Sequence, residues 1–174
     1  ASVTRATASL IEAPVPVVAM LNGFCIGGGI VVATACDIRI CTEGSRFGVP
    51  AGRLGLGFEL DNFIRLQSLV GRGMALEMLA TARQLTALQA FNVGLVNNVV
   101  PQGKLEDAVR EMVAMMSATA PMTYAAAKLA SRAALDPSLR DAAQRAIDAC
   151  FDSADFTEGR AAFHARRHPT FTGR

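Results

Sequence analysis

The sequence lacks the features that mark membrane-spanning and exported proteins. No uninterrupted apolar run reaches the length of a transmembrane helix, because Asn22, the glycines after it and Asp37 interrupt the most hydrophobic region. The first segment carries Arg5 and Glu12 and has no long apolar core, so no signal peptide is predicted. We therefore expect a cytoplasmic protein that does not bind membranes.

Cysteine and net charge are also scarce. The four cysteines have neither the paired spacing of a zinc site nor the density of a disulfide scaffold, and we expect them to be small buried residues: Cys25, Cys36, Cys41 and Cys150. No cluster of His, Cys and carboxylate residues has metal-ligand spacing, so no metal site is predicted. A net charge of +2 is too small to indicate a nucleic-acid partner.

What the chain does contain is apolar residues in patterns typical of an α/β protein. Its 174 residues are 51% hydrophobic and 18% charged, which suits a sizeable core. Strands are predicted at residues 17–21, 38–41, 46–49 and 96–100. Helices are predicted at residues 2–12, 63–70, 74–79, 105–116, 125–134, 139–151 and 157–167, with Thr86 and Pro121 as helix starts. We expect an α/β core over residues 1–100 and a helical region over residues 101–174.

Three consecutive glycines, Gly27, Gly28 and Gly29, follow the apolar segment 16–21 and precede the helix-like stretch 30–36. A strand that enters such a glycine segment and then opens a helix directs unpaired backbone N–H groups at negative charge. Because glycine has no Cβ, a substrate oxygen can approach the main chain closely. The alternative is that the glycines only allow a helix to pack tightly on a strand.

Other glycine motifs do not fit this segment. A dinucleotide-binding fingerprint requires a further glycine where Val32 stands, and a P-loop requires Lys and Ser or Thr where Gly29 and Ile30 stand. No Gly-x-Ser-x-Gly motif occurs in the chain. An oxyanion hole for an acyl group fits better.

Residues 16–39, which contain this glycine segment, resemble the signature of the crotonase superfamily, the enoyl-CoA hydratase/isomerase family. The likeness continues in order through residues 47–50, 54–55, 69–71, 75–79, 85–90, 94–100 and 158–163. It implies a spiral core of ββα turns, followed by a helical region that packs at a trimer interface. It also implies an acyl-CoA substrate and a homotrimer or a dimer of trimers, with no cofactor beyond the coenzyme A of the substrate.

In this family a thioester carbonyl becomes an enolate, whose oxygen is stabilised by two preorganised donors. The resemblance assigns the second donor to the N–H of Gly28 and places Cys25, Ile26 and Gly27 beside the substrate. An earlier stretch supplies the first donor in the family, along with much of the coenzyme A cleft and the first strands. Since this sequence starts with the helix before the signature, we expect the piece alone to be inactive.

The positions that carry acid and base in the family differ here. Hydratases have one Glu three residues after the middle glycine and another directly after a Phe-x-x-Pro motif, and these two positions are Val31 and Ala51. Neither side chain can exchange a proton. Hydration by two glutamates and isomerisation by the second one are therefore both disfavoured.

The loop at residues 54–61 offers other chemistry. By resemblance, Glu59 falls where 4-chlorobenzoyl-CoA dehalogenase has its nucleophilic Asp, and Phe58 falls where methylmalonyl-CoA decarboxylase has a Tyr. Residues 151–159 and 169–173 also look most like that decarboxylase. Decarboxylation needs an enolate stabiliser and an apolar pocket, so a decarboxylase-like lyase is predicted. Alternatively, Glu59 and Asp61 are solvated loop carboxylates, or Asp61 caps a helix that begins at Asn62.

Near the end of the chain, Phe163 and Arg166 fall where the family places an aromatic ring and a Lys against coenzyme A. The alternative is a solvated basic helix end.

The sequence leaves two hypotheses for function. The first is an acyl-CoA enzyme of the lyase or isomerase kind, and the second is a non-catalytic homologue that acts in assembly or binding. A divergent enoyl-CoA hydratase is a further alternative.

Overall fold

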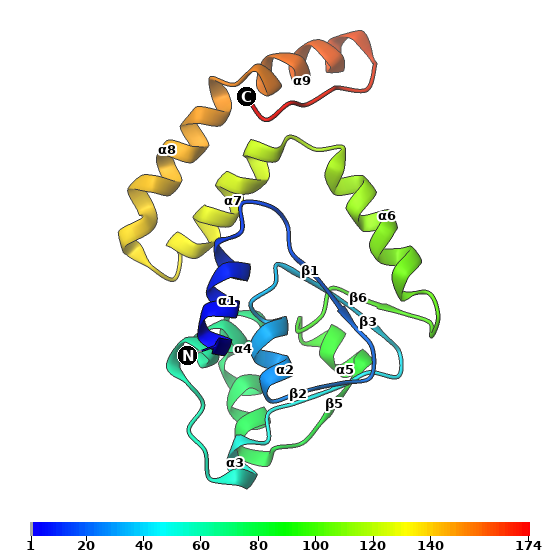
Figure 1. The fold of residues 1–174 in the computed structure, drawn as a ribbon, viewed down its shortest axis with the longest axis vertical. Coiled ribbons are helices and arrows are strands. Elements are labelled where there is room, and N and C mark those ends of the chain that lie inside the picture. Colours follow the sequence, from blue (N-terminus) through cyan, green and yellow to red (C-terminus); the bar gives the residue numbers. More distant parts are fainter. Residues whose placement is uncertain (1) are drawn as a thin grey trace. The chain divides into compact units, whose positions relative to one another are not determined.

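The computed structural model describes residues 2–174, and it divides into one unit that ends at Arg110 and a second that runs from Glu111 to Arg174. The first unit mixes strands and helices, and the second is helical (Figure 1). The predicted α/β class is thus confirmed. Helix α6 (Leu105–Ser117) spans the division.

The strands of the first unit form two small sheets. Within the described residues, one sheet has the order β1-β3-β6 (Val18–Leu21, Ile38–Thr42 and Asn98–Val100) and is parallel throughout. The other has the order β2-β4-β5 (Phe24–Ile26, Arg46–Gly48 and Leu85–Thr86), in which β2 and β4 are parallel and β5 is antiparallel. The first four strands therefore alternate between the two sheets, whereas β5 joins the sheet of β4 and β6 joins the sheet of β3.

Five helices of the described residues accompany these strands: α1 (Ser2–Glu12), α2 (Gly28–Ala33), α3 (Ala51–Leu54), α4 (Leu60–Thr81) and α5 (Ala87–Asn92). Residues from α2, α4, α5 and the sheet of β2 and β4 share one core, in which Ile30, Phe47 and Leu66 are almost completely buried. Burying side chains of this size supplies about 1.5–3 kcal/mol each. This core holds α2 against its strands.

Several element boundaries follow from local signals. Thr86 starts α5 with a capping box, because its hydroxyl accepts from the Gln89 N–H while the Gln89 side chain accepts from the Thr86 N–H. Pro121 starts α7 (Pro121–Ala133) at the first helical position. Both predicted helix starts are confirmed. The helices predicted on either side of Gly71 join as α4, which breaks at that glycine with φ 77°.

Two expectations are wrong in detail. Helix α4 begins at Leu60, because Glu59 is extended and occupies the N-cap, so Asp61 lies in the first turn and does not cap a helix starting at Asn62. The strand predicted at residues 96–100 covers only Asn98–Val100. Asn97 instead exchanges hydrogen bonds with Arg39, and Val96 is buried after α5.

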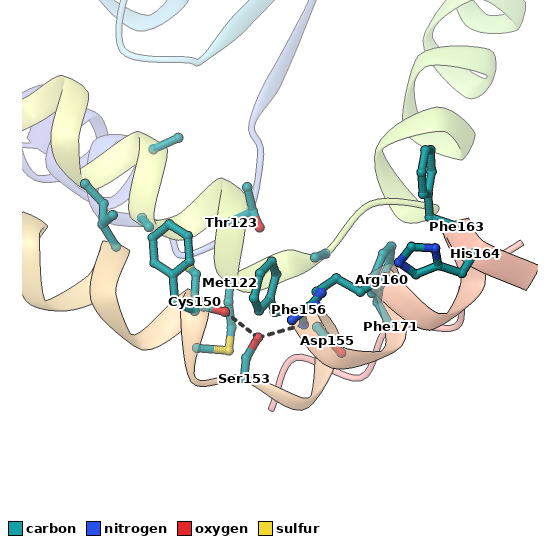
Figure 2. Close-up of a pocket in the computed structure, with 16 residues that line it drawn as sticks. Met122, Thr123, Cys150, Ser153, Asp155, Phe156, Arg160, Phe163, His164 and Phe171 are labelled. Atoms are coloured by element: carbon teal, nitrogen blue, oxygen red, sulfur yellow. Dashed lines mark hydrogen bonds between the residues drawn. The ribbon is translucent and has the colours of Figure 1, made fainter.

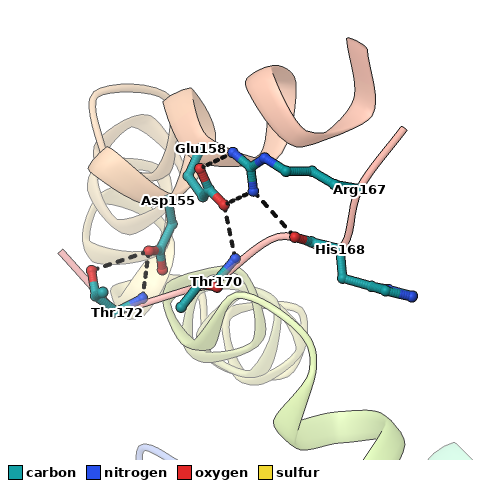
Figure 3. A network of polar contacts seen from close by, with 6 residues as sticks. All are labelled: Asp155, Glu158, Arg167, His168, Thr170 and Thr172. Atoms are coloured by element: carbon teal, nitrogen blue, oxygen red, sulfur yellow. Dashed lines mark hydrogen bonds and ion pairs between the residues drawn. The ribbon is translucent and has the colours of Figure 1, made fainter. Parts of the chain in front are cut away.

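The second unit is a helical hairpin with a third helix and a returning tail. Helix α7 packs against α8 (Arg140–Phe151) after the 3-10 turn η1 (Pro137–Leu139), and α9 (Ala154–Ala165) follows. After α9 the chain reverses and runs back along it, as Figure 3 shows. Of the helices described here, none combines the length and the apolar character that crossing a membrane requires.

Candidate functional site

The glycine segment forms a sharp turn between β2 and α2. Strand β2 pairs Cys25 with Phe47 and Ile26 with Gly48 of β4. The Gly27 N–H then donates to the Gly48 carbonyl over 2.9 Å, and Gly27 turns the chain with φ 55°. That positive φ favours glycine, and Gly27 is the N-cap of α2 without any side-chain cap. The turn also lies against Pro50, whose Cδ would be 3.8 Å from a Cβ on Gly27.

The first amides of α2 have no acceptor among the described residues. Val31 donates to the Gly27 carbonyl over 3.2 Å, while the N–H groups of Gly28 and Gly29 make no backbone bond in residues 2–174. Both glycines are exposed, and a Cβ on Gly28 would meet no atom within 4 Å. This arrangement leaves backbone donors, strengthened by the helix dipole, available to an anionic oxygen.

Several residues that the sequence predicts to line the site lie in the wall behind the glycine turn. Cys25 and Ala51 belong to the buried core, and Val31 is buried to a similar degree. Ile26 is half-buried in β2, and Phe58 is half-buried against the same core. These side chains make the wall apolar, and Val31 and Ala51 are the positions that the resemblance assigns to the two glutamates of hydratases.

Glu59 lies outside this wall. It is exposed at the start of α4, and its side chain does not cap the helix. A carboxylate at a helix N-terminus is favoured by the macrodipole, and one with no partner in the cap is free to act on a ligand. Its catalytic role remains a prediction.

None of the four cysteines forms a disulfide bond. Cys25 and Cys41 are buried, as expected, while Cys36 and Cys150 are half-buried. Burial raises the pKa of the Cys25 and Cys41 thiols to about 11, so both are neutral thiols at physiological pH and are poor nucleophiles. No group of three or more His, Cys, Asp and Glu side chains within residues 2–174 could hold a metal ion.

A groove of about 470 Å³ runs along β1 and α2 in the first unit. Its lining includes Cys25, Gly29 and Val32, so it borders the glycine turn, and also Met20 and Phe24, which are 48% and 77% exposed. Large apolar side chains exposed together mark a surface suited to binding.

The second unit contains a larger apolar groove of about 710 Å³ between α7, α8 and α9 (Figure 2). Phe151, Phe156, Phe163 and Phe171 are among its lining residues, and Phe163 is 81% exposed. The Arg160 guanidinium lies 5.6 Å from the Phe156 ring centroid. Ser153 caps α9, accepting from the Phe156 N–H and donating to the Cys150 carbonyl.

The two residues predicted to contact coenzyme A both lie at the end of α9. Phe163 lines the large groove, whereas Arg166 is the exposed residue that ends the helix with φ 52°. His164 and His168 are also exposed. The structure brings Phe163 and Arg166 to one helix end, and their contact with a coenzyme remains a prediction.

A polar network that sequence reasoning missed holds the tail against α9 (Figure 3). Glu158 accepts from Arg167 through both oxygens, over 2.6 and 2.7 Å, and from the Thr170 N–H over 2.9 Å. These hydrogen bonds lower the pKa of Glu158 to about 2. Buried Asp155 accepts from the N–H groups of Thr172 and Gly173. In the sequence, the signal for this network was Asp155 and Glu158 on α9 followed by Arg167.

Comparison with known proteins identifies the family. The family model described as "Enoyl-CoA hydratase/isomerase" matches residues 2–174. The chain is 35% identical to the protein YngF of Bacillus subtilis, over 99% of this chain and 68% of that protein. It is 32% identical to carnitinyl-CoA dehydratase of Salmonella paratyphi A, over 91% of this chain and 64% of that enzyme.

Solved structures agree with the fold. The crystal structure of an enoyl-CoA hydratase/carnithine racemase from Magnetospirillum magneticum matches with a TM-score of 0.87 at 30% identity, and the match covers 98% of this chain and 64% of that one. This match confirms the predicted crotonase-like fold. The chain spans about two thirds of the length of these relatives. It belongs to the enoyl-CoA hydratase/isomerase family.

Proposed function

We propose that the protein processes acyl-CoA thioesters and that the N–H of Gly28 stabilises the thioester oxygen as an enolate forms. The observation that carries this proposal is the exposed Gly28 amide, which has no acceptor among the described residues and begins α2. A preorganised donor contributes to catalysis because its bond strengthens as charge develops on the oxygen. Removing one such donor typically lowers kcat by about 10²–10³-fold.

For the reaction, we propose decarboxylase-like chemistry. Val31 and Ala51, which the resemblance assigns to the positions where hydratases carry acid and base, are buried and apolar. Loss of carbon dioxide from the α-carbon needs no base, because the departing carboxylate leaves its electron pair to form the enolate. Exposed Glu59 is then the candidate that returns a proton to the α-carbon.

A divergent hydratase or dehydratase is the second catalytic candidate. It is favoured by the 32% identity to carnitinyl-CoA dehydratase, whose name indicates removal of water. In that case Glu59 supplies the proton transfer that Val31 and Ala51 cannot.

A non-catalytic role in assembly or binding is the alternative from another class. It is favoured by the exposed Phe24 and by the apolar groove that includes Phe151 and Phe163.

We propose a homotrimer, or a dimer of trimers, assembled through the helical region at residues 101–174. Phe163 and Arg166 are proposed to contact the coenzyme A part of the substrate. The cytoplasm as location remains a prediction.

Turnover of two substrates by the full-length protein tests these proposals. A decarboxylase-like enzyme converts methylmalonyl-CoA to propionyl-CoA, a hydratase adds water to crotonyl-CoA, and a binding protein processes neither. The assay follows both products by chromatography. Conversion of neither substrate, in a preparation that binds the thioesters, contradicts the enzymatic proposal.

A further inference from the structure

Arg39 is a buried arginine whose charged group bonds the main chain. It lies in β3 and is only 3% exposed. Its Nε donates to the Leu95 carbonyl over 2.7 Å, and its Nη1 donates to the carbonyls of Cys36 and Ala33 over 2.7 and 3.4 Å. Burial lowers the pKa of the guanidinium, but arginine keeps its charge at neutral pH.

The carbonyls that accept from the Arg39 side chain show which parts of the fold it connects. Ala33 is the last residue of α2, and Cys36 lies just beyond the helix. Carbonyls at a helix C-terminus have no intrahelical partner, and the negative end of the helix dipole favours a cation there. Leu95 follows α5 and lies 56 residues after Arg39, so the guanidinium ties the end of α2 to a segment that is distant in the sequence.

The main chain of Arg39 is fixed as well. Its N–H donates to the Asn97 side-chain oxygen over 2.9 Å, and its carbonyl accepts from the Asn97 N–H over 2.8 Å. The main chain and the guanidinium of Arg39 are thus both held by the segment between α5 and β6. Because few torsions of the side chain remain free, the guanidinium can fix the position of the groups that it bonds.

Helix α2 needs such an external support. It has six residues and begins with two glycines after an N-cap that makes no side-chain bond. Helices this short are not stable by themselves, and glycine at the start leaves the backbone loosely restrained. The Arg39 contacts act at the opposite end of α2 from Gly28.

We propose that Arg39 is a positioning residue, which holds the direction of α2 and thereby the direction of the Gly28 N–H. This inference rests on the proposed function of that amide. At about 1.5 Å per residue, α2 is about 9 Å long, so a tilt of about 10° at its far end moves the Gly28 amide by about 1.5 Å. A misplacement of about 1 Å in a catalytic group can cost about 10²-fold in rate.

The proposed test replaces Arg39 with Lys and with Gln and uses Arg46→Lys as a matched control. Arg46 also donates to two main-chain carbonyls, Gly44 and Ser45, and neither belongs to α2. A lysine ammonium lacks the planar fork that bonds carbonyls in separate directions. Arg39→Lys therefore loses the support of α2 while it keeps the charge.

The probe is acetoacetyl-CoA, whose acidic α-carbon allows the bound thioester to ionise and whose enolate absorbs in the near ultraviolet. Only folded protein binds the probe. The enolate absorbance divided by the amount of bound probe therefore gives the enolised fraction of the bound probe, and partial unfolding does not change this fraction. We expect the wild type and Arg46→Lys to enolise the probe equally. Arg39→Lys is expected to lower the equilibrium ratio of enolate to ketone about tenfold with little change in KM for substrate.

Each of the following outcomes would overturn the positioning role of Arg39. An undiminished enolate ratio in folded Arg39→Lys or Arg39→Gln overturns the positioning role and leaves the proposed function intact. If both variants fail to fold, Arg39 serves the fold alone, and the inference is also overturned. If the wild type binds the probe without enolising it, the proposed function of Gly28 fails, and the inference fails with it.

Discussion

The amide of Gly27 donates to the carbonyl of Gly48 over 2.9 Å and so extends the pairing of β2 and β4 by one residue. The chain then turns at Gly27, with φ 55°, into α2. The next amide, that of Gly28, consequently leaves the sheet before the helix can offer it an acceptor. The sheet bond thus occupies the Gly27 amide, and among the described residues the Gly28 and Gly29 amides remain without a backbone acceptor.

Proline at position 28 tests this donor. Because proline suits the first position of a helix, Gly28→Pro removes the amide hydrogen at a place where the fold accepts it. We expect kcat for the acyl-CoA substrate to fall about 10²–10³-fold. Ala154→Pro is the matched control, since Ala154 is the exposed first residue of α9. Equal turnover by the two variants would show that the Gly28 amide is not used.

Glutamine at position 59 tests the exposed carboxylate of α4. Glu59→Gln keeps the shape of the side chain but removes its ability to exchange a proton, so we expect turnover to fall by about 10²-fold or more. Asp61→Asn is the control, because Asp61 is an exposed carboxylate in the first turn of the same helix. A near-wild-type rate for Glu59→Gln would remove Glu59 from the mechanism.

The contact between Glu158 and the tail should depend on pH. Hydrogen bonds from Arg167 and from the Thr170 N–H lower the pKa of Glu158 from 4.5 to about 2. A carboxyl with a depressed folded pKa stabilises the fold above its unfolded pKa, and this contribution is lost as the pH falls through the folded pKa. We expect the Thr170 amide to lose its protection from hydrogen exchange, followed by NMR, between about pH 4.5 and about pH 2.

Glu158→Gln supplies the comparison for that titration. The amide cannot ionise, so protection of Thr170 should be weaker in this variant and constant over the same pH range. If the variant shows the same pH dependence as the wild type, another group controls the tail.

Alkylation tests the state of the buried thiols. Burial raises the pKa of Cys25 and Cys41 to about 11, so iodoacetamide at pH 8 should spare both while the protein is folded. Half-buried Cys150 is the internal reference. Peptide mass spectrometry should show Cys150 modified first. Modification of Cys25 at the rate of Cys150 would mean that the wall behind the glycine turn is open to solvent.

The parts of the fold that sequence predicts well depend on neighbouring residues. The strand, glycines and helix around Gly28 lie within one short segment, and Thr86 with Gln89 is a complete local helix-start signal. The start of α4 was missed because it depends on the extended backbone of Glu59, which no adjacent residue type dictates. Strand β6 begins late because Asn97 pairs with Arg39, which is far away in sequence.

In the predicted site, too, the features set by neighbouring residues could be predicted and those set by distant residues could not. The glycine turn and the apolar Val31 and Ala51 could be found by position along the chain. Arg39 could not, since its acceptors are main-chain carbonyls, and every residue type has one. The bonds of Asp155 to the tail were missed for a similar reason, because they reach amides 17 and 18 residues away.

A crystal structure with a bound acyl-CoA thioester tests the central claim most directly. The account predicts that the thioester oxygen lies about 2.7–3.1 Å from the Gly28 nitrogen, in line with its N–H. A thioester oxygen bound elsewhere, with the Gly28 amide still facing solvent, would contradict it.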